Sequence, residues 1–233
     1  VAAQMMPFTS PARRPVLEAR LAYKLKSPDA EAKFSVAGKA ALSDSGLLLD
    51  RAAALKASGN NWGARELLAN RPALSAPPVL PKEWLKTLLS YAQSAAGDGS
   101  YETAYRIASK VQDVLPAGRN VSDEDLTTRD HFTSLTWLAG TTALKKLGRP
   151  RDAMEMFRLY STGAKSPQTR SKGLYWAGKA AQSAGDGALA KRYFTDASVY
   201  FDYFHGQLAL EALGQTLPAV PTGPALPKKK KTT

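Results

Sequence analysis

From Val16 onward, the pattern of hydrophobic and polar residues predicts short helices separated by brief breaks at glycine and proline. The expected helices are Val16–Lys26, the Ala-rich stretch after Pro28, Leu47–Ala57, Lys82–Ala96, Tyr101–Leu115 and a long helix that ends near Leu147. We expect Asp44 to cap Leu47–Ala57 and Gly59 to end it, and Ser122 with Asp123 to cap the long helix. The pattern therefore indicates a chain built mainly from helices.

The segment Arg71–Pro81 contains four prolines. Proline removes a backbone donor and clashes with the preceding turn of a helix. We therefore predict a loop here.

Four segments of the chain share one spacing, in which a glycine is followed five residues later by an alanine and four residues after that by an apolar or small residue. They are Gly59/Ala64/Leu68, Gly99/Ala104/Ala108, Gly148/Ala153/Phe157 and Gly185/Ala190/Phe194. Such a unit is typical of a helical hairpin: the glycine ends the first helix, and the alanine lets the second pack closely against it. Because single hairpins cannot bury their apolar faces, they stack on one another. The repeat predicts a curved α-solenoid of tetratricopeptide-like hairpins, a horseshoe or a ring segment.

Composition supports an all-α fold. The 233 residues include 39 Ala and 29 Leu but only 9 Val and 1 Ile, which leaves few of the β-branched residues that favour strands. The expected organisation is an extended N-terminal arm over 1–15, an α-superhelical repeat domain over 16–215 and a Pro/Lys-rich linker or tail over 216–233.

Charge narrows the possible partners. The 32 Lys and Arg exceed the 20 Asp and Glu, for a net charge of +12, and four of the lysines form the run Lys228–Lys231. An excess of this size suits an anionic surface or an acidic polymer. The basic residues are spread over many helices rather than gathered on one recognition helix, so we expect no nucleic acid. No apolar run approaches the roughly 18–20 residues of a membrane span, so we expect no transmembrane segment.

No arrangement of residues in the sequence indicates catalysis. The chain has no cysteine and only two histidines, His131 and His205. Neither has an Asp or Glu four residues before or after it, as a metal site on a helix would favour, and no G-x-S-x-G element supports a serine nucleophile. Gly-rich phosphate-binding motifs are also missing. We therefore assign no catalytic residue, no metal site and no cofactor, and expect both histidines to be ordinary helix residues.

The segment from Tyr193 to Phe204 contains six aromatic residues within twelve positions. These rings are candidates for a stacking platform for sugars or bases. Alternatively, they cap the end of the helical core or dock a following domain, and a helical spacing should bury most of them. The candidate glycan-binding or domain-docking residues are Tyr200, Tyr203, Phe204, His205 and Gln207.

Two blocks near the C-terminus have a more specific pattern. They are Tyr175-Trp176-Ala177-Gly178-Lys179-Ala180-Ala181, followed by Gly185-Asp186 and Ala190, and Tyr200 through Phe204-His205-Gly206-Gln207-Leu208-Ala209 to Leu213-Gly214. Earlier segments fit the same pattern: Leu47–Arg51, Trp62 with Ala64, Pro81-Lys82-Glu83-Trp84, Tyr101 to Ala108 and Trp137-Leu138-Ala139-Gly140. Over about residues 28–215, the chain resembles the helical-repeat region of soluble lytic murein transglycosylases. His205 stands where that family often has an aromatic residue.

This resemblance implies a periplasmic protein that faces peptidoglycan. In the family, a separate lysozyme-like module follows the helical region and cleaves the MurNAc–GlcNAc bond, with one glutamate as acid and then base, to leave a 1,6-anhydro end. The catalytic Glu-Ser block has no match here. The resemblance therefore implies a non-catalytic scaffold that positions glycan strands in cell-wall turnover, with a C-terminal lysozyme-like module as partner.

Two other functions fit the same residues. A tetratricopeptide-like adaptor would bind segments of other proteins in its concave groove. Alternatively, the chain itself is an enzyme, which release of anhydro-muropeptides by this polypeptide alone would establish.

Overall fold

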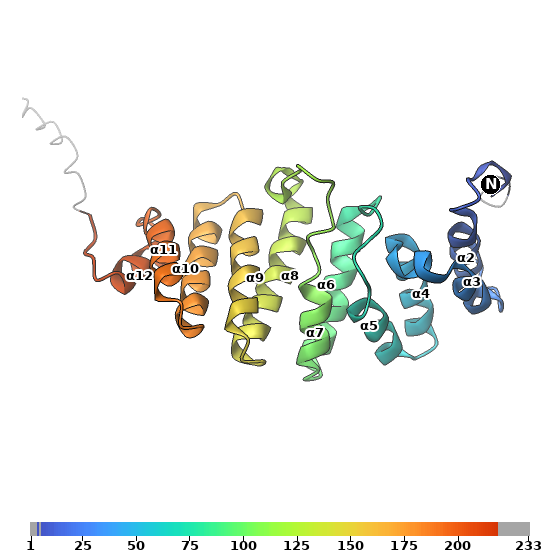
Figure 1. The fold of residues 1–233 in the computed structure, drawn as a ribbon, viewed down its shortest axis with the longest axis horizontal. Helices are drawn as coiled ribbons and strands as arrows, with labels where there is room; N and C mark the ends of the chain where they lie inside the picture. Colours follow the sequence, from blue (N-terminus) through green and yellow to red (C-terminus); the bar gives the residue numbers. More distant parts are fainter. Residues whose placement is uncertain (1–3, 5, 219–233) are drawn as a thin grey trace, which may run out of the picture.

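The computed structural model describes residue 4 and residues 6–218. This part of the chain is all-helical and contains no strand, as the composition predicted. Its α-helices are α2 (Arg14–Lys24), α3 (Ala30–Ser43), α4 (Ser45–Ala57), α5 (Asn61–Ala69), α6 (Pro81–Gly97), α7 (Tyr101–Ala108), α8 (Leu126–Lys145), α9 (Pro150–Gly163), α10 (Pro167–Ser183), α11 (Gly187–Ser198) and α12 (Phe204–Ala212). Two short 3-10 helices are η1 (Met6–Phe8) and η2 (Val121–Asp123). The helices follow one another in chain order along the long axis (Figure 1).

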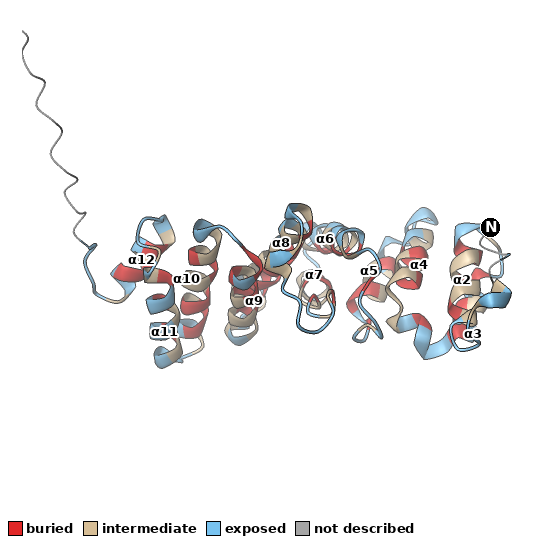
Figure 2. Ribbon diagram, turned by 90° about the horizontal axis from the view of Figure 1, so that it is seen from above, coloured by how far each residue is buried: buried red, intermediate tan, exposed pale blue. Residues whose placement is uncertain are grey.

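The four glycine–alanine segments each form a helical hairpin, as the spacing predicted. The glycines lie in the turns of α4–α5, α6–α7, α8–α9 and α10–α11, and all four have positive φ, from +64° to +83°. The alanines that follow are buried in the second helix of each pair. In three of these pairs, α6–α7, α8–α9 and α10–α11, the first helix lies toward one side of the array and the second toward the other (Figure 2).

The hydrophobic core is a series of clusters along this array. One cluster joins α2, α3 and α4, and a larger one runs from α4 to α9. Two smaller clusters link α8 to α10 and α10 to α12. Each helix thus buries its apolar face mainly against its neighbours in the chain, so any surface feature is positioned by two or three adjacent helices.

The structure differs in detail from the expected organisation near both ends of the described chain. Within the expected N-terminal arm, residues 6–8 form η1 and α2 begins at Arg14, two residues earlier than predicted. After α12, residues 213–218 form a turn followed by irregular chain. The rest of the Pro/Lys-rich segment, including Lys228–Lys231, lies outside the described residues.

The predicted helix Tyr101–Leu115 is too long, because α7 ends at Ala108. The next residues leave the helix to make tertiary contacts. Lys110 Nζ donates to the carbonyl oxygens of Ala69 and Arg71, at 2.7 and 2.6 Å, and Val111 and Val114 are buried in the core. These contacts outweigh the local helical tendency.

The predicted cap of the long helix is also wrong. Ser122 and Asp123 belong to η2, and α8 begins at Leu126. Asp125 caps it, because its carboxylate accepts hydrogen bonds from the backbone N–H groups of Thr127 and Thr128. The acidic residues 123–125 therefore precede the helix rather than form its first turn.

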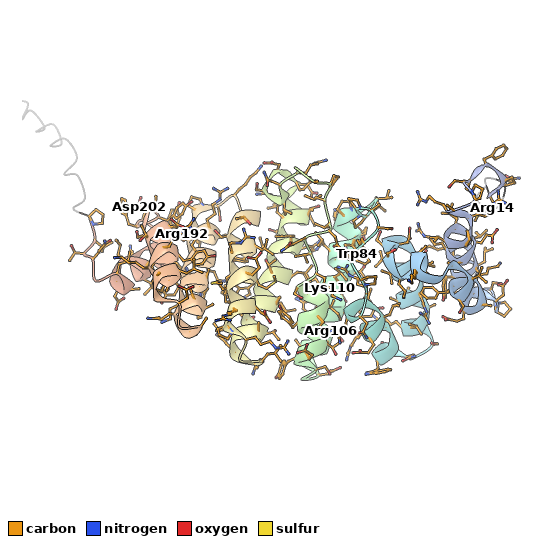
Figure 3. All side chains as sticks on the ribbon, in the orientation of Figure 1. Arg14, Trp84, Arg106, Lys110, Arg192 and Asp202 are labelled. Atoms are coloured by element: carbon orange, nitrogen blue, oxygen red, sulfur yellow. The ribbon has the colours of Figure 1, made fainter. Side chains whose placement is uncertain are left out.

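Arg71 fixes the proline-rich loop between α5 and α6. Its side chain is fully buried, with the guanidinium 5.0 Å from the Trp84 ring centroid and 2.9 Å from the Asp113 carboxylate. It also donates to the carbonyl oxygen of Lys110, and Asp113 accepts from the N–H of Leu74. Figure 3 places Trp84 and Lys110 together near the middle of the molecule. We call Arg71, Trp84 and Asp113 the buried arginine clamp.

Candidate ligand-binding site

Two tryptophans from neighbouring hairpins face each other. Trp137 lies on α8 and Trp176 on α10, and both side chains are half-buried. Their ring centroids are 6.1 Å apart, in an edge-to-face arrangement. The ring of Phe157, from α9, is 5.3 Å from Trp137 and 6.0 Å from Trp176 and is completely buried. The pair therefore rests on a fixed aromatic floor and stays partly open to solvent.

Small residues in α8 and α10 make this packing possible. A Cβ added at Gly140 would lie 2.7 Å from the Phe157 ring, and one at Gly178 would lie 2.6 Å from the ring of Phe194. Each phenylalanine of a second helix thus packs directly against the backbone of the helix before it. The Trp137–Gly140 and Trp176–Gly178 blocks therefore combine a half-exposed ring with close helix packing beneath it.

Each tryptophan is paired with a lysine from the other hairpin. Lys172 Nζ, on α10, is 3.6 Å from the Trp137 ring centroid and 5.6 Å from that of Tyr160. Lys145 Nζ, on α8, is 5.2 Å from the Trp176 ring centroid. We call Trp137, Lys145, Lys172 and Trp176 the Lys–Trp strip. It crosses from α8 to α10 and offers aromatic surface and positive charge side by side.

No carboxylate of the described residues neutralises the charge of the strip. Neither lysine forms an ion pair with an Asp or Glu in the described part of the chain, where other basic groups form such pairs. Helix α10 carries Arg170, Lys172 and Lys179 and has no acidic residue. Burial lowers the pKa of Lys172 below its ordinary value. The two ammonium groups are therefore available to an anion.

The residues expected to form the site lie further along the array, and the structure brings one of them close to the strip. His205, in α12, has its ring 5.7 Å from that of Tyr175, which in turn is 6.0 Å from Trp176. Burial, and then the positive charge of Lys172, lower the pKa of His205. The ring of Tyr175 thus lies between His205 and the strip.

The other four candidates do not join it. Tyr200 and Tyr203 lie in the turn before α12, and Phe204 and Gln207 are exposed on α12 itself. The expectation that most of the six aromatics in 193–204 are buried is wrong, since only Phe194 is. The reason is that residues 199–203 form a turn instead of continuing the helix. Gly206 keeps this turn close, because a Cβ there would overlap the carbonyl oxygen of Tyr200.

Sequence reasoning missed the lysines of the strip. The sequence pattern includes Trp137 and Trp176 only within the blocks that resemble the transglycosylase family, and it includes neither Lys145 nor Lys172 as a candidate. A signal was present, because Lys172 precedes Trp176 by four residues and Lys145 follows Trp137 by eight, which places each lysine on the same helix face as the tryptophan. The pairing across hairpins needs the structure.

Two further findings bear on function. His131 is half-buried on α8, and its Nδ1 atom is buried without a hydrogen-bond partner in the described residues. No helix in the described part of the chain is both long and apolar enough to cross a membrane. Compared with protein-family models, curated proteins and solved structures, the chain matches none.

Proposed function

We propose that this chain is the non-catalytic helical scaffold of a periplasmic peptidoglycan lytic transglycosylase, and that it holds glycan strands for a separate lysozyme-like module. The observation that carries the proposal is the Lys–Trp strip, in which two half-exposed indole rings lie beside two lysines that have no carboxylate partner in the part of the chain that the structure describes. In this proposal the strip is the glycan-binding surface.

The chemistry of the strip suits peptidoglycan in particular. The C–H faces of pyranose rings pack on aromatic rings, whose hydrophobic area is large and rigid. Peptidoglycan also carries carboxylates, on muramic acid or on its stem peptides, which lysine side chains attract. A neutral glycan would use only the rings, and a simple anion only the lysines. A polymer with both features uses the whole strip.

The same proposal includes the arrangement of the helices. We infer that the four hairpins stack as a tetratricopeptide-like superhelix, which would give a horseshoe or a ring segment. The shared glycine turns and buried alanines of the hairpins support this arrangement. Such a superhelix would present the first helices of successive hairpins, including α8 and α10, along one continuous surface.

Co-sedimentation with purified sacculi at low and high salt tests the proposal. We expect the wild-type chain to bind at both, more weakly at high salt because ammonium–carboxylate attraction is screened. Trp176→Leu should reduce the bound fraction, while Trp62→Leu, at a tryptophan that is 74% exposed on α5, should not. A version without Lys228–Lys231 should bind like the wild type.

A second pair of variants tests the charge of the strip. The double change Lys145→Met with Lys172→Met should weaken binding at low salt, and the matched change Lys165→Met with Lys191→Met, at two exposed lysines outside the strip, should not. If the folded wild-type chain stays in the supernatant at every salt concentration, the proposal is wrong. If the Lys228–Lys231 deletion alone abolishes binding, the helical body does not recognise glycan.

A protein-binding adaptor is the second candidate, and one observation favours it. The chain after α11 exposes large apolar side chains, and the most exposed of them are Val199, Phe204 and Leu217. Phe204 and Leu217 line a cavity of about 340 Å³. A protein partner that remains bound after peptidoglycan is digested, and that is lost with Phe204→Ser, would support the adaptor.

A further inference from the structure

Lys172 and Trp137, in the strip, are in direct contact with each other. Lys172 Nζ lies 3.6 Å from the centroid of Trp137 and so covers one face of that indole. The same ammonium lies 5.6 Å from the Tyr160 ring and has no acidic partner in the described residues. A sugar can pack on this face of Trp137 only if Lys172 first moves away.

A carboxylate is the group that can draw Lys172 away. An ammonium forms a stronger, charge-assisted hydrogen bond with a carboxylate than its contact with a ring face. Lysine has a long, flexible stem, and Lys172 is held by no hydrogen bond or ion pair among the described residues that would keep it in place. Partial burial disfavours the charged form of Lys172, and an anionic partner offsets that cost.

We propose that Lys172 is a displaceable cover on Trp137, which exchanges the indole face for a carboxylate carried on a pyranose ring and thereby opens that face for the sugar. This inference rests on the proposed function and narrows its ligand to a glycan whose carboxylate lies next to the ring, as in muramic acid with a free lactyl group. Binding of the carboxylate by Lys172 and stacking of the sugar on Trp137 then occur together, because the first exposes the ring face that the second needs.

The surroundings of Lys172 fit this exchange. Two other basic residues border the strip from other helices, Lys145 on α8 and His205 on α12, and burial lowers the pKa of His205. Tyr160 and Tyr175 add aromatic surface on the two sides of the strip. Phe157 is fully buried under the tryptophans, so the rings keep their positions when the lysine moves. Of these groups, Lys172 alone covers Trp137.

Calorimetry with two disaccharides tests the exchange. GlcNAc–MurNAc with a free lactyl carboxylate and N,N′-diacetylchitobiose have similar rings, but only the first has an anion. We expect the wild-type chain to bind GlcNAc–MurNAc about tenfold or more tighter, a difference of about 1.4 kcal/mol. Lys172→Met keeps the apolar stem but cannot pair with an anion, so it should remove the preference. Lys172→Arg and the exposed control Lys165→Met should keep it.

Tryptophan fluorescence reports the movement itself. GlcNAc–MurNAc should change the emission of the wild-type chain as the ammonium leaves Trp137, and the change should be absent in Lys172→Met. Thermal unfolding of each variant checks that it is folded.

The outcomes separate the two proposals. Equal binding of both disaccharides, binding of neither, or a preference that survives in Lys172→Met overturns the exchange, while sacculus binding through the strip would still support the scaffold. Failure to bind sacculi overturns the scaffold and the exchange together.

Discussion

Two cation–aromatic pairs in this molecule have opposite surroundings. In the buried arginine clamp, Arg71 lies 5.0 Å from the Trp84 ring centroid, and its guanidinium is bound to Asp113 and to backbone carbonyls. In the Lys–Trp strip, Lys172 lies 3.6 Å from the Trp137 centroid, half-exposed and without a carboxylate partner among the described residues. The difference shows that closeness to a ring does not by itself define a site. A buried cation that is paired with a carboxylate and with backbone carbonyls holds the structure, and a half-exposed cation without such a pair is free for a ligand.

The largest expected effect comes from breaking the clamp. Arg71→Met leaves the Asp113 carboxylate without its cation in a mostly buried place, and loss of one partner of a buried pair costs about 3 kcal/mol. Arg149→Met, at the exposed Arg149–Glu102 pair, should cost much less, because solvent screens an exposed ion pair. Urea unfolding of both variants measures the difference. Equal losses would contradict the distinction drawn between buried and exposed pairs.

A change in the packing of Phe157, which lies under the two tryptophans of the strip, should have a smaller effect on stability. A Cβ at Gly140 meets the Phe157 ring at 2.7 Å, so Gly140→Ala forces that ring away from α8 and should destabilise the fold by about 2 kcal/mol. It should also change the near-ultraviolet circular dichroism of the tryptophans. Gly97→Ala in α6, where an added Cβ meets no atom within 4 Å, is the matched control and should be neutral or slightly stabilising.

Lys172→Met completes the comparison and should change stability little. It removes one lysine–indole contact and also the cost of keeping a charge half-buried, so the free energy of unfolding should shift by no more than about 1 kcal/mol. Its effect should appear in ligand binding instead. A loss as large as that of Arg71→Met would mean that Lys172 is structural.

The smallest expected effect is a dependence of the melting temperature on pH, which arises from His205 near the strip. The pKa of His205 is lowered from 6.5 by burial and by Lys172, so the unfolded chain binds more protons than the folded one as pH falls through about 6.5. The melting temperature should therefore decrease from neutral to mildly acidic pH. His205→Phe should flatten this decrease. A variant with an unchanged pH profile would show that His205 contributes nothing to it.

The sequence was sufficient to predict the helical hairpins but not all of their ends. Asp44, Pro81 and the four glycine turns act through local backbone chemistry, which is visible in the sequence. The end of α7 depends on contacts of Lys110 and Asp113 with residues about forty positions earlier. No local pattern records those contacts, so the helix was predicted too long.

The site was harder to predict for the same reason. Tyr200, Tyr203, Phe204, His205 and Gln207 were chosen because aromatic residues are dense in that segment. The density of aromatic residues along the chain does not show which rings meet in space, and among these candidates His205 comes close to the strip, through the ring of Tyr175. Trp137 and Lys172 are 35 positions apart and come together because α8 and α10 flank α9. The side chains that form the strip could be recognised only after the hairpins were placed.

The arginine clamp also bears on how this chain folds. An array in which each hairpin packs mainly on its neighbours can open from either end, one unit at a time. The Arg71–Asp113 pair joins residues 42 positions apart and ties the loop after the α4–α5 hairpin to the one after α6–α7. These two hairpins should therefore open together, with the slowest amide hydrogen exchange in α6 and faster exchange toward α2 and α12. The buried side chain of Arg71 would thus make these two hairpins unfold as a single cooperative unit.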